Sequence, residues 1–225
     1  IWSTYLGGSD ADGIFYLVVD TDERAVVTGG TQSSNFPTSA SANQGTFGGD
    51  KDGFASVIDS AGTTLIASTF IGTSGYDQSF IVGTDKTNHI YLFGQTEATG
   101  NTFNVNTAIG VSGGNQFLMK YDPMLTTIVW SNAFGSASGS PDIAPTALLV
   151  DLCDKIYCTG WGGVLNPFGQ GTNGLITTPD AFQSSTDNND FYLYVMDNQA
   201  QSLIYASFLG GPNSLDHVDG GTSRF

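Results

Sequence analysis

The chain has 225 residues, of which 30 are glycine and only 12% are charged, a composition that favours short strands with tight turns over a helical bundle or a disordered segment. The formal net charge is −15, so the protein repels phosphate backbones and anionic headgroups, which argues against nucleic acid and membrane surfaces as partners. No apolar run approaches the ~18 to 20 residues of a membrane span, so we expect no membrane insertion.

Strand-like runs of apolar and β-branched residues, bounded by Asp, Asn and Gly, follow one another along the chain. The first four lie at 14–19, 25–28, 53–58 and 63–70. The next four lie at 79–83, 90–93, 116–121 and 127–130, and the last four at 147–150, 156–159, 191–196 and 203–206. No amphipathic stretch of helical length interrupts them, so an all-β fold is predicted.

A short marker motif divides these strands into repeats. Ser3-Thr4-Tyr5-Leu6-Gly7-Gly8 returns at 68–73, 131–136 and 207–211, about 63 to 75 residues apart. The spacing predicts repeats at 3–67, 68–130 and 131–206, with a partial repeat at 207–225. Four strands per repeat are typical of a β-propeller blade, whereas the rungs of a β-solenoid are much shorter. Since propellers have ~4 to 8 blades, we expect residues 1–225 to be a fragment of a larger propeller whose other blades are its partners.

Several separated motifs carry a resemblance to a known family. The first repeat contains Val27-Thr28-Gly29, Asn35-Phe36-Pro37-Thr38 and Asp52-Gly53-Phe54, and the third keeps Tyr157-Cys158-Thr159-Gly160 and Thr178-Pro179-Asp180-Ala181-Phe182. Together they resemble the bacterial SBBP-type β-propeller repeat over essentially the whole chain. The segments 154–163 and 217–225 resemble large exported surface proteins of gliding Bacteroidota-type bacteria that use type IX secretion. The resemblance implies an extracellular or cell-surface location and a scaffold or adhesion role.

Aspartates recur at three fixed places in the repeats. Carboxylates are hard donors that suit Ca²⁺, and Asp10 and Asp12 within Ser9-Asp10-Ala11-Asp12-Gly13 resemble part of a calcium loop. The alternative is that each recurring aspartate accepts backbone N–H bonds in an Asx-type turn. Residues that recur in every blade usually build the blade, which favours the alternative. The recurring positions are Asp12, Asp77, Asp142 and Asp216; Asp20, Asp85 and Asp151; and Asp59, Asp122 and Asp197.

The two cysteines, Cys153 and Cys158, flank a predicted hairpin. In an exported protein they are candidates for a disulfide, provided that the strand register brings them together. The alternative is a pair of reduced, partly buried thiols.

No catalytic set stands out along the chain. His89 and His217 lack a second His or Cys at ligand spacing, and Gly135-Ser136-Ala137-Ser138-Gly139 has alanine where a nucleophile elbow needs serine. We therefore predict a protein that is not an enzyme. The alternative is part of a propeller-fold glycan lyase or hydrolase whose site is completed by other blades.

The loop between the second and third strands is longest in the third repeat, and function tends to lie where loops depart from the scaffold. Aromatic faces pack against sugar rings and amides bond hydroxyls, so this loop is a candidate site for a surface glycan or protein. The alternative is that the tryptophan of this loop only fills a gap between blades. The candidate ligand-binding residues are Trp161, Asn166, Phe168, Gln170 and Asn173.

Overall fold

The computed structural model describes residues 1–166, 168 and 170–217 as strands, turns and loops, with no helix among them. Each of the predicted strand runs forms a strand, so the all-β prediction is confirmed. Within these described residues no helix could span a membrane.

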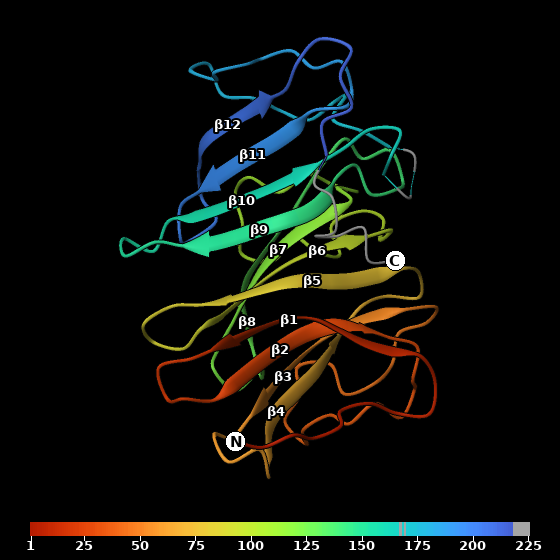
Figure 1. The fold of residues 1–225 in the computed structure, drawn as a ribbon, viewed down its shortest axis with the longest axis vertical. Coiled ribbons are helices and arrows are strands. Elements are labelled where there is room, and N and C mark those ends of the chain that lie inside the picture. Colours follow the sequence, from red (N-terminus) through yellow and green to blue (C-terminus); the bar gives the residue numbers. More distant parts are fainter. Residues whose placement is uncertain (167, 169, 218–225) are drawn as a thin grey trace. The chain divides into compact units, whose positions relative to one another are not determined.

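The strands form three four-stranded sheets, each built from consecutive strands (Figure 1). The first contains β1 (Asp12–Val19), β2 (Ala25–Thr31), β3 (Asp52–Ile58) and β4 (Leu65–Ile71), paired antiparallel in that order. The second contains β5 (Asp77–Thr84), β6 (Ile90–Thr96), β7 (Gln116–Tyr121) and β8 (Ile128–Phe134). The third contains β9 (Ala144–Val150), β10 (Ile156–Trp161), β11 (Phe191–Met196) and β12 (Leu203–Leu209).

Some strands run further than the apolar pattern predicts, because glycine lets two backbones approach closely. The predicted run 25–28 ends before Gly29, yet β2 continues to Thr31. A Cβ on Gly29 would lie 1.8 Å from the carbonyl oxygen of Gly13 on β1. Glycine at this position therefore keeps the two strands paired rather than ending them.

The chain divides into two units, Ile1–Ala98 with Leu118–Val129 and Thr99–Phe117 with Trp130–Phe225. In the first unit, Val27, Phe36, Phe54 and Phe70 form a buried cluster on the first sheet. Phe15 on β1 also stacks on Phe80 of β5, with ring centroids 5.2 Å apart. This apolar contact and the hydrogen bond from the Asp77 N–H to the Lys51 carbonyl, at 2.8 Å, both link the first sheet to β5.

Aromatic stacking supplies the core of the second unit as well. Phe103 stacks on Phe117 with centroids 4.8 Å apart, and Phe134 stacks on Tyr194 at 4.5 Å. Phe103 comes from the loop after β6, just as Phe36 comes from the loop after β2. The loops after the second strands therefore contribute to the core and are not merely connections.

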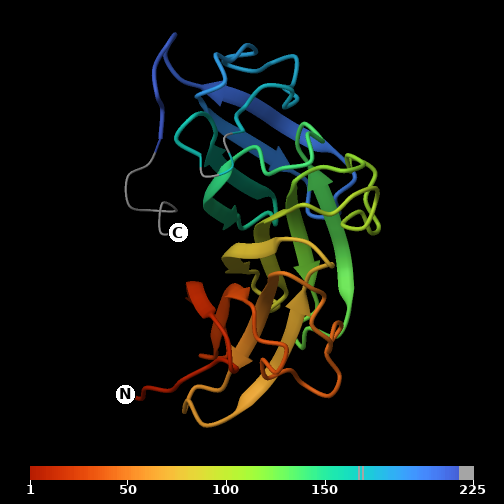
Figure 2. The same ribbon diagram turned by 90° about the vertical axis from the view of Figure 1, so that its right-hand side faces the viewer.

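These loops are also fastened to the last strand of their own sheet, as the orange loop beside β4 shows in Figure 2. Ser39 N–H donates to the Ser68 carbonyl at 3.0 Å, and Thr178 N–H donates to the Ala206 carbonyl at 3.0 Å. In the middle repeat, the N–H of Val105 bonds the carbonyl of Ser131 at 2.9 Å. The loop is thus a built part of each repeat.

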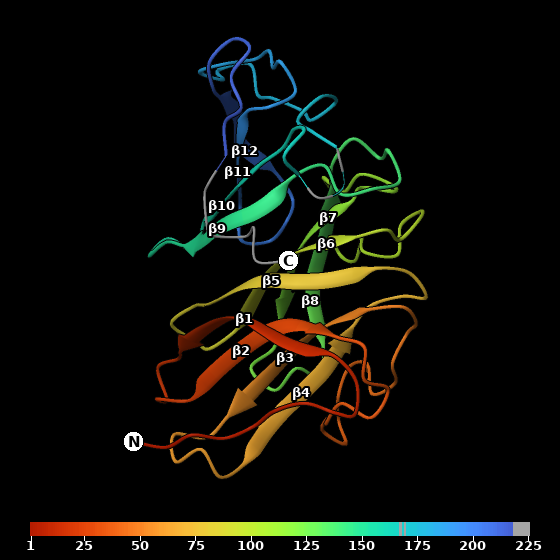
Figure 3. The same cartoon turned by 45° about the vertical axis from the view of Figure 1, so that its right-hand side comes forward.

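The marker motif ends the last strand of each sheet, at Ile71, Phe134 and Leu209. Its first copy, residues 3–8, forms no strand and runs past the first sheet toward β1 (Figure 3). There Trp2 Nε1 donates to the Ser60 carbonyl at 2.8 Å. Of the predicted partial repeat 207–225, residues 218–225 lie outside the described residues, including most of the motif 217–225.

Candidate functional site

The first set of recurring aspartates bonds the marker motif, and Asp77 and Asp142 in this way join one sheet to the next. In each copy, the residue after the marker glycine donates its N–H to the aspartate that follows a few positions later. Gly8 N–H reaches Asp12 at 2.6 Å and Thr73 N–H reaches Asp77 at 2.6 Å. The other two bonds join Ser136 to Asp142 at 2.7 Å and Gly211 to Asp216 at 3.1 Å. We call these four pairs the marker joints.

The other two sets of aspartates build hairpin turns. Asp20 Oδ1 accepts the N–H groups of Asp22 and Arg24, both at 2.9 Å. Asp85 and Asp151 accept bonds from the second and fourth residues after them in the same way. Asp122 and Asp197 repeat the pattern, and Asp59 bonds Thr63 and Thr64. The Asx-turn interpretation is therefore confirmed for both sets.

The calcium candidates have internal partners. Asp12 accepts hydrogen bonds from Thr31 Oγ1 and from Ser33 Oγ, in addition to Gly8 N–H. The backbone N–H of Asp10 donates to Ser33 Oγ at 2.8 Å. Within the part of the chain that the structure describes, no three His, Cys, Asp or Glu side chains gather into a group able to hold a metal ion. Asp12 therefore closes a joint, and its position gives calcium binding there no support.

The two cysteines are both free thiols, which agrees with the alternative of two reduced cysteines and not with the candidate disulfide. Cys158 is buried within β10 and 2% exposed, whereas Cys153 is exposed in the turn that precedes the strand. The N–H of Cys153 is held by Asp151 at 2.8 Å, which fixes that turn. Burial raises the pKa of the Cys158 thiol, so this group stays protonated.

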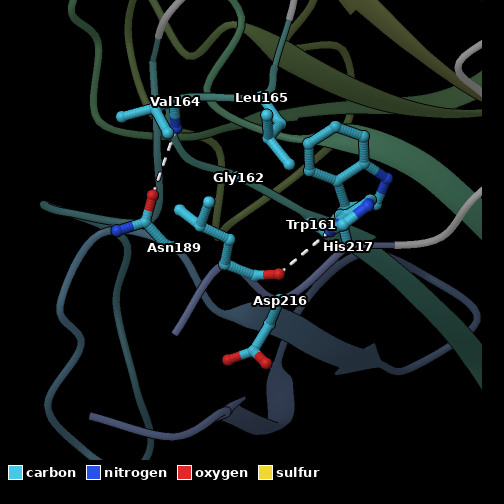
Figure 4. Close-up of a pocket in the computed structure, with 8 residues that line it drawn as sticks. Trp161, Gly162, Val164, Leu165, Asn189, Asp216 and His217 are labelled. Atoms are coloured by element: carbon cyan, nitrogen blue, oxygen red, sulfur yellow. Dashed lines mark hydrogen bonds between the residues drawn. The ribbon is translucent and has the colours of Figure 1, made fainter. Parts of the chain in front are cut away.

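Trp161, the main predicted ligand contact, is only 3% exposed. Its ring borders a hollow lined also by Val164, Leu165, Leu215 and His217, and this hollow leaves no room for a water molecule (Figure 4). The edge of the Trp161 ring meets the ring of His217, with centroids 5.9 Å apart. A buried indole cannot stack on a sugar, so the prediction is wrong for Trp161, whose role is packing.

Asn166 is also buried, at 3% exposure, and its side chain holds the loop together. Its Nδ2 donates to the Asp142 carbonyl at 3.0 Å, and its Oδ1 accepts the N–H of Phe168 at 3.2 Å. It is therefore also removed from the candidate ligand set. Phe168 and Gln170 are half-buried and Asn173 is exposed, so these three remain candidates.

The hydrogen bonds also place the extra length of this loop. Thr178 and Gln183 bond β12 as Ser39 and Gln44 bond β4, so residues 178–190 match the first repeat and the additional residues lie within 162–177. That segment exposes apolar side chains, with Val164 68% and Leu165 47% exposed. The adjacent Val-Leu pair is the sequence signal for this surface, and it contains neither the aromatic nor the amide side chains that mark a glycan site.

Carboxyl groups with a raised pKa lie at the marker joints. Burial raises the pKa of Asp77 and of Asp142, against hydrogen bonds from Thr73 and Thr96 and from Ser136. Burial likewise raises the pKa of Asp52, the first residue of β3, to about 6, with a further contribution from the charge of Asp77. Carboxyl groups are thus concentrated where the chain leaves one sheet and enters the next.

The pKa of Asp85 is shifted in the opposite direction. Burial alone would raise its pKa, but hydrogen bonds from Thr87, His89 and Tyr91 lower it to about 2. Lys120 Nζ lies 3.4 Å from Asp85 Oδ2 and 4.9 Å from the centre of the Tyr91 ring. Hydrogen bonds to Asp85 and the Tyr91 ring beside Lys120 support this buried pair, which is typical of a structural ion pair.

The chain was compared with models of known protein families and with curated proteins, and neither comparison gives a match.

Proposed function

We propose that this chain is a non-catalytic β-propeller module that serves as a scaffold or adhesion unit. The observation that supports this best is the internal use of the recurring polar residues. The aspartates of the three sets are engaged in turns and joints, so they are committed to holding the repeats together. Three successive four-stranded sheets support the propeller architecture.

We place recognition on the segment 162–177, because it contains the residues by which this loop of the third repeat exceeds the loop of the first. Phe168, Gln170 and Asn173 would supply its aromatic and amide contacts, and Val164 and Leu165 an apolar one. A surface glycan or a protein is the partner class that suits this mixture.

Location at the cell surface or outside the cell rests on the SBBP-type resemblance and on the acidic composition. The free thiols give this location no additional support. Detection of the protein in the culture medium or by antibody on intact cells would test it.

A loop exchange tests the recognition surface. Replacing residues 162–177 by the shorter segment 32–38 of the first repeat should keep the strands, as measured by circular dichroism, and abolish binding on a glycan array or to whole cells. The matched control exchanges residues 32–38 for a glycine-serine segment of equal length. Unchanged binding by the loop exchange would contradict the placement.

The glycan-active alternative predicts turnover. Incubation with a panel of polysaccharides should release neither reducing ends nor unsaturated products. Release of either product would reject the non-catalytic proposal.

A further inference from the structure

Two carboxylates converge beside the last marker glycine. Asp190 Oδ1 lies 1.8 Å, and Asp216 Oδ2 2.4 Å, from the position that a Cβ on Gly210 would take. The two oxygens therefore lie close together, and the absence of a side chain on Gly210 makes the approach possible. The N–H of Asp216 donates to the Asn189 carbonyl at 3.0 Å, which ties the two segments together.

The carboxylate of Asp190 has little compensation for its burial. Asp190 is 1% exposed and its Oδ1 is buried without a hydrogen-bond partner. Its Oδ2 accepts one long bond, from Gln183 Nε2 at 3.4 Å. A second buried oxygen without a partner, Asp187 Oδ2, comes only three residues earlier. Buried carboxylates normally have hydrogen bonds or a cation, so these oxygens point to a missing positive partner.

No protein cation fills that role among the described residues, where the ion pairs involve only Asp20, Asp22 and Asp85. Asp190 is buried and Asp216 is half-buried, and both carboxylates border the Cβ position of Gly210, so their like charges repel each other there. A bound cation would remove the repulsion.

The corresponding positions of the other repeats have different neighbours. In the first repeat Asp52 replaces Asp190, and Gly48 N–H satisfies its Oδ2 at 2.8 Å. There, the three atoms nearest the Cβ position of Gly72 all belong to Asp52, whose Oδ1 is also buried without a hydrogen-bond partner and whose pKa is raised by burial and in part by the charge of Asp77. In the middle repeat the neutral Asn115 takes the position, and its Oδ1 accepts the N–H of Gly139 at 3.1 Å. The third repeat differs from the other two in that oxygens of two aspartates are among the atoms nearest the Cβ position of its marker glycine.

We propose that Asp190 and Asp216 bind a divalent cation, with Ca²⁺ the preferred ion, at the third marker joint. Both ligands are hard carboxylate oxygens, which suit Ca²⁺ rather than metals that prefer nitrogen or sulfur. Ca²⁺ takes ~6 to 8 oxygens, so carbonyl oxygens and water complete the shell, and with two protein carboxylates the affinity falls in the weak range of ~10⁻⁴ to 10⁻³ M. The site goes beyond the proposed function, and its failure would leave that proposal standing.

Thermal unfolding of the whole chain in EDTA and in millimolar CaCl₂, at equal ionic strength, tests the site. The melting temperature should rise with Ca²⁺ and rise less with Mg²⁺. Asp190→Asn should remove the rise, whereas the matched control Asp52→Asn should keep it. An unchanged melting temperature of the parent protein, or a full rise in Asp190→Asn, would overturn the proposal.

A luminescence measurement covers the case in which Asp190→Asn fails to fold. Asp216 and Trp161 line the same hollow (Figure 4), so Tb³⁺ used as a calcium substitute should emit when the indole is excited. Asp216→Asn should remove this emission, and CaCl₂ should displace it in the parent protein. Emission that persists in Asp216→Asn, or that Ca²⁺ does not displace, would reject the site.

Discussion

At the residue scale, the marker glycines are required for space. A Cβ on Gly7 would lie 2.7 Å from Asp12 Oδ2, and one on Gly72 would lie 2.4 Å from the carboxyl group of Asp52. Such separations are far below van der Waals contact. Glycine recurs because a carboxylate occupies the volume that a side chain would need, and at Gly135, where φ is 132°, the backbone conformation is an additional reason.

Gly72→Ala should therefore destabilise the protein by about 1 to 3 kcal/mol, because the new methyl group must displace a buried carboxylate. Urea denaturation measures the loss. Gly45→Ala is the control, since nothing lies within 4 Å of its Cβ position, and it should be neutral or slightly stabilising. Equal midpoints for both variants would show that the joint tolerates a side chain.

The two thiols should differ in reactivity. Cys153 is exposed, whereas Cys158 is buried and its raised pKa keeps it protonated. A thiol reagent should therefore modify one cysteine in the native protein and both in denaturant, and Cys153→Ser should remove the native reaction. Two unreactive cysteines in denaturant without reductant would instead indicate a disulfide.

At the element scale, the aspartate hairpins explain why the strands could be predicted from sequence. The first and third strands of each sheet are followed by an aspartate whose side chain bonds the backbone of the turn, so strand and turn signals agree locally. Twelve strands followed from this agreement. The packing of one sheet on another could not be predicted in this way, because partners such as Phe15 and Phe80 are distant in sequence and no local signal pairs them.

The β5–β6 hairpin gives a pH dependence with a defined sign. The pKa of Asp85 falls from 3.8 to about 2 on folding, so its stabilisation is complete above about pH 4 and is lost as the pH falls toward 2. The advantage of the parent protein over Asp85→Asn should shrink by about 2 kcal/mol across that interval. Chemical denaturation at several pH values measures it, and a pH-independent difference would contradict this origin.

The candidate site was predicted less well than the fold. The long loop was found from sequence, but burial of Trp161 and Asn166 depends on Leu215, His217 and the Asp142 carbonyl, which come from other segments. Residue type alone cannot distinguish a tryptophan that contacts ligand from one that packs under a neighbouring segment. The convergence of Asp190 with Asp216 escaped prediction for the same reason, since a third segment, at Gly210, brings them together.

At the scale of the whole molecule, the charge of −15 acts against folding, because the acidic groups are closer together in the folded chain than in the unfolded one. Salt shortens the Debye length to ~10 Å at 0.1 M and weakens this repulsion. The melting temperature should therefore rise with NaCl and with KCl to the same extent. A fall with added salt would show that attractive surface ion pairs outweigh the repulsion.

The marker joints make each repeat a unit that can be duplicated or deleted as a whole. The two joints that lie between sheets bond the end of one sheet to the start of the next through residues only a few positions apart, such as Thr73 with Asp77. A duplicated gene segment that runs from one joint to the next therefore encodes one bonding partner of a joint at each of its ends. Each of these residues bonds the complementary partner in the neighbouring repeat. The array can lengthen or shorten by whole repeats without any new bond having to evolve, whereas a segment of any other length leaves a joint broken.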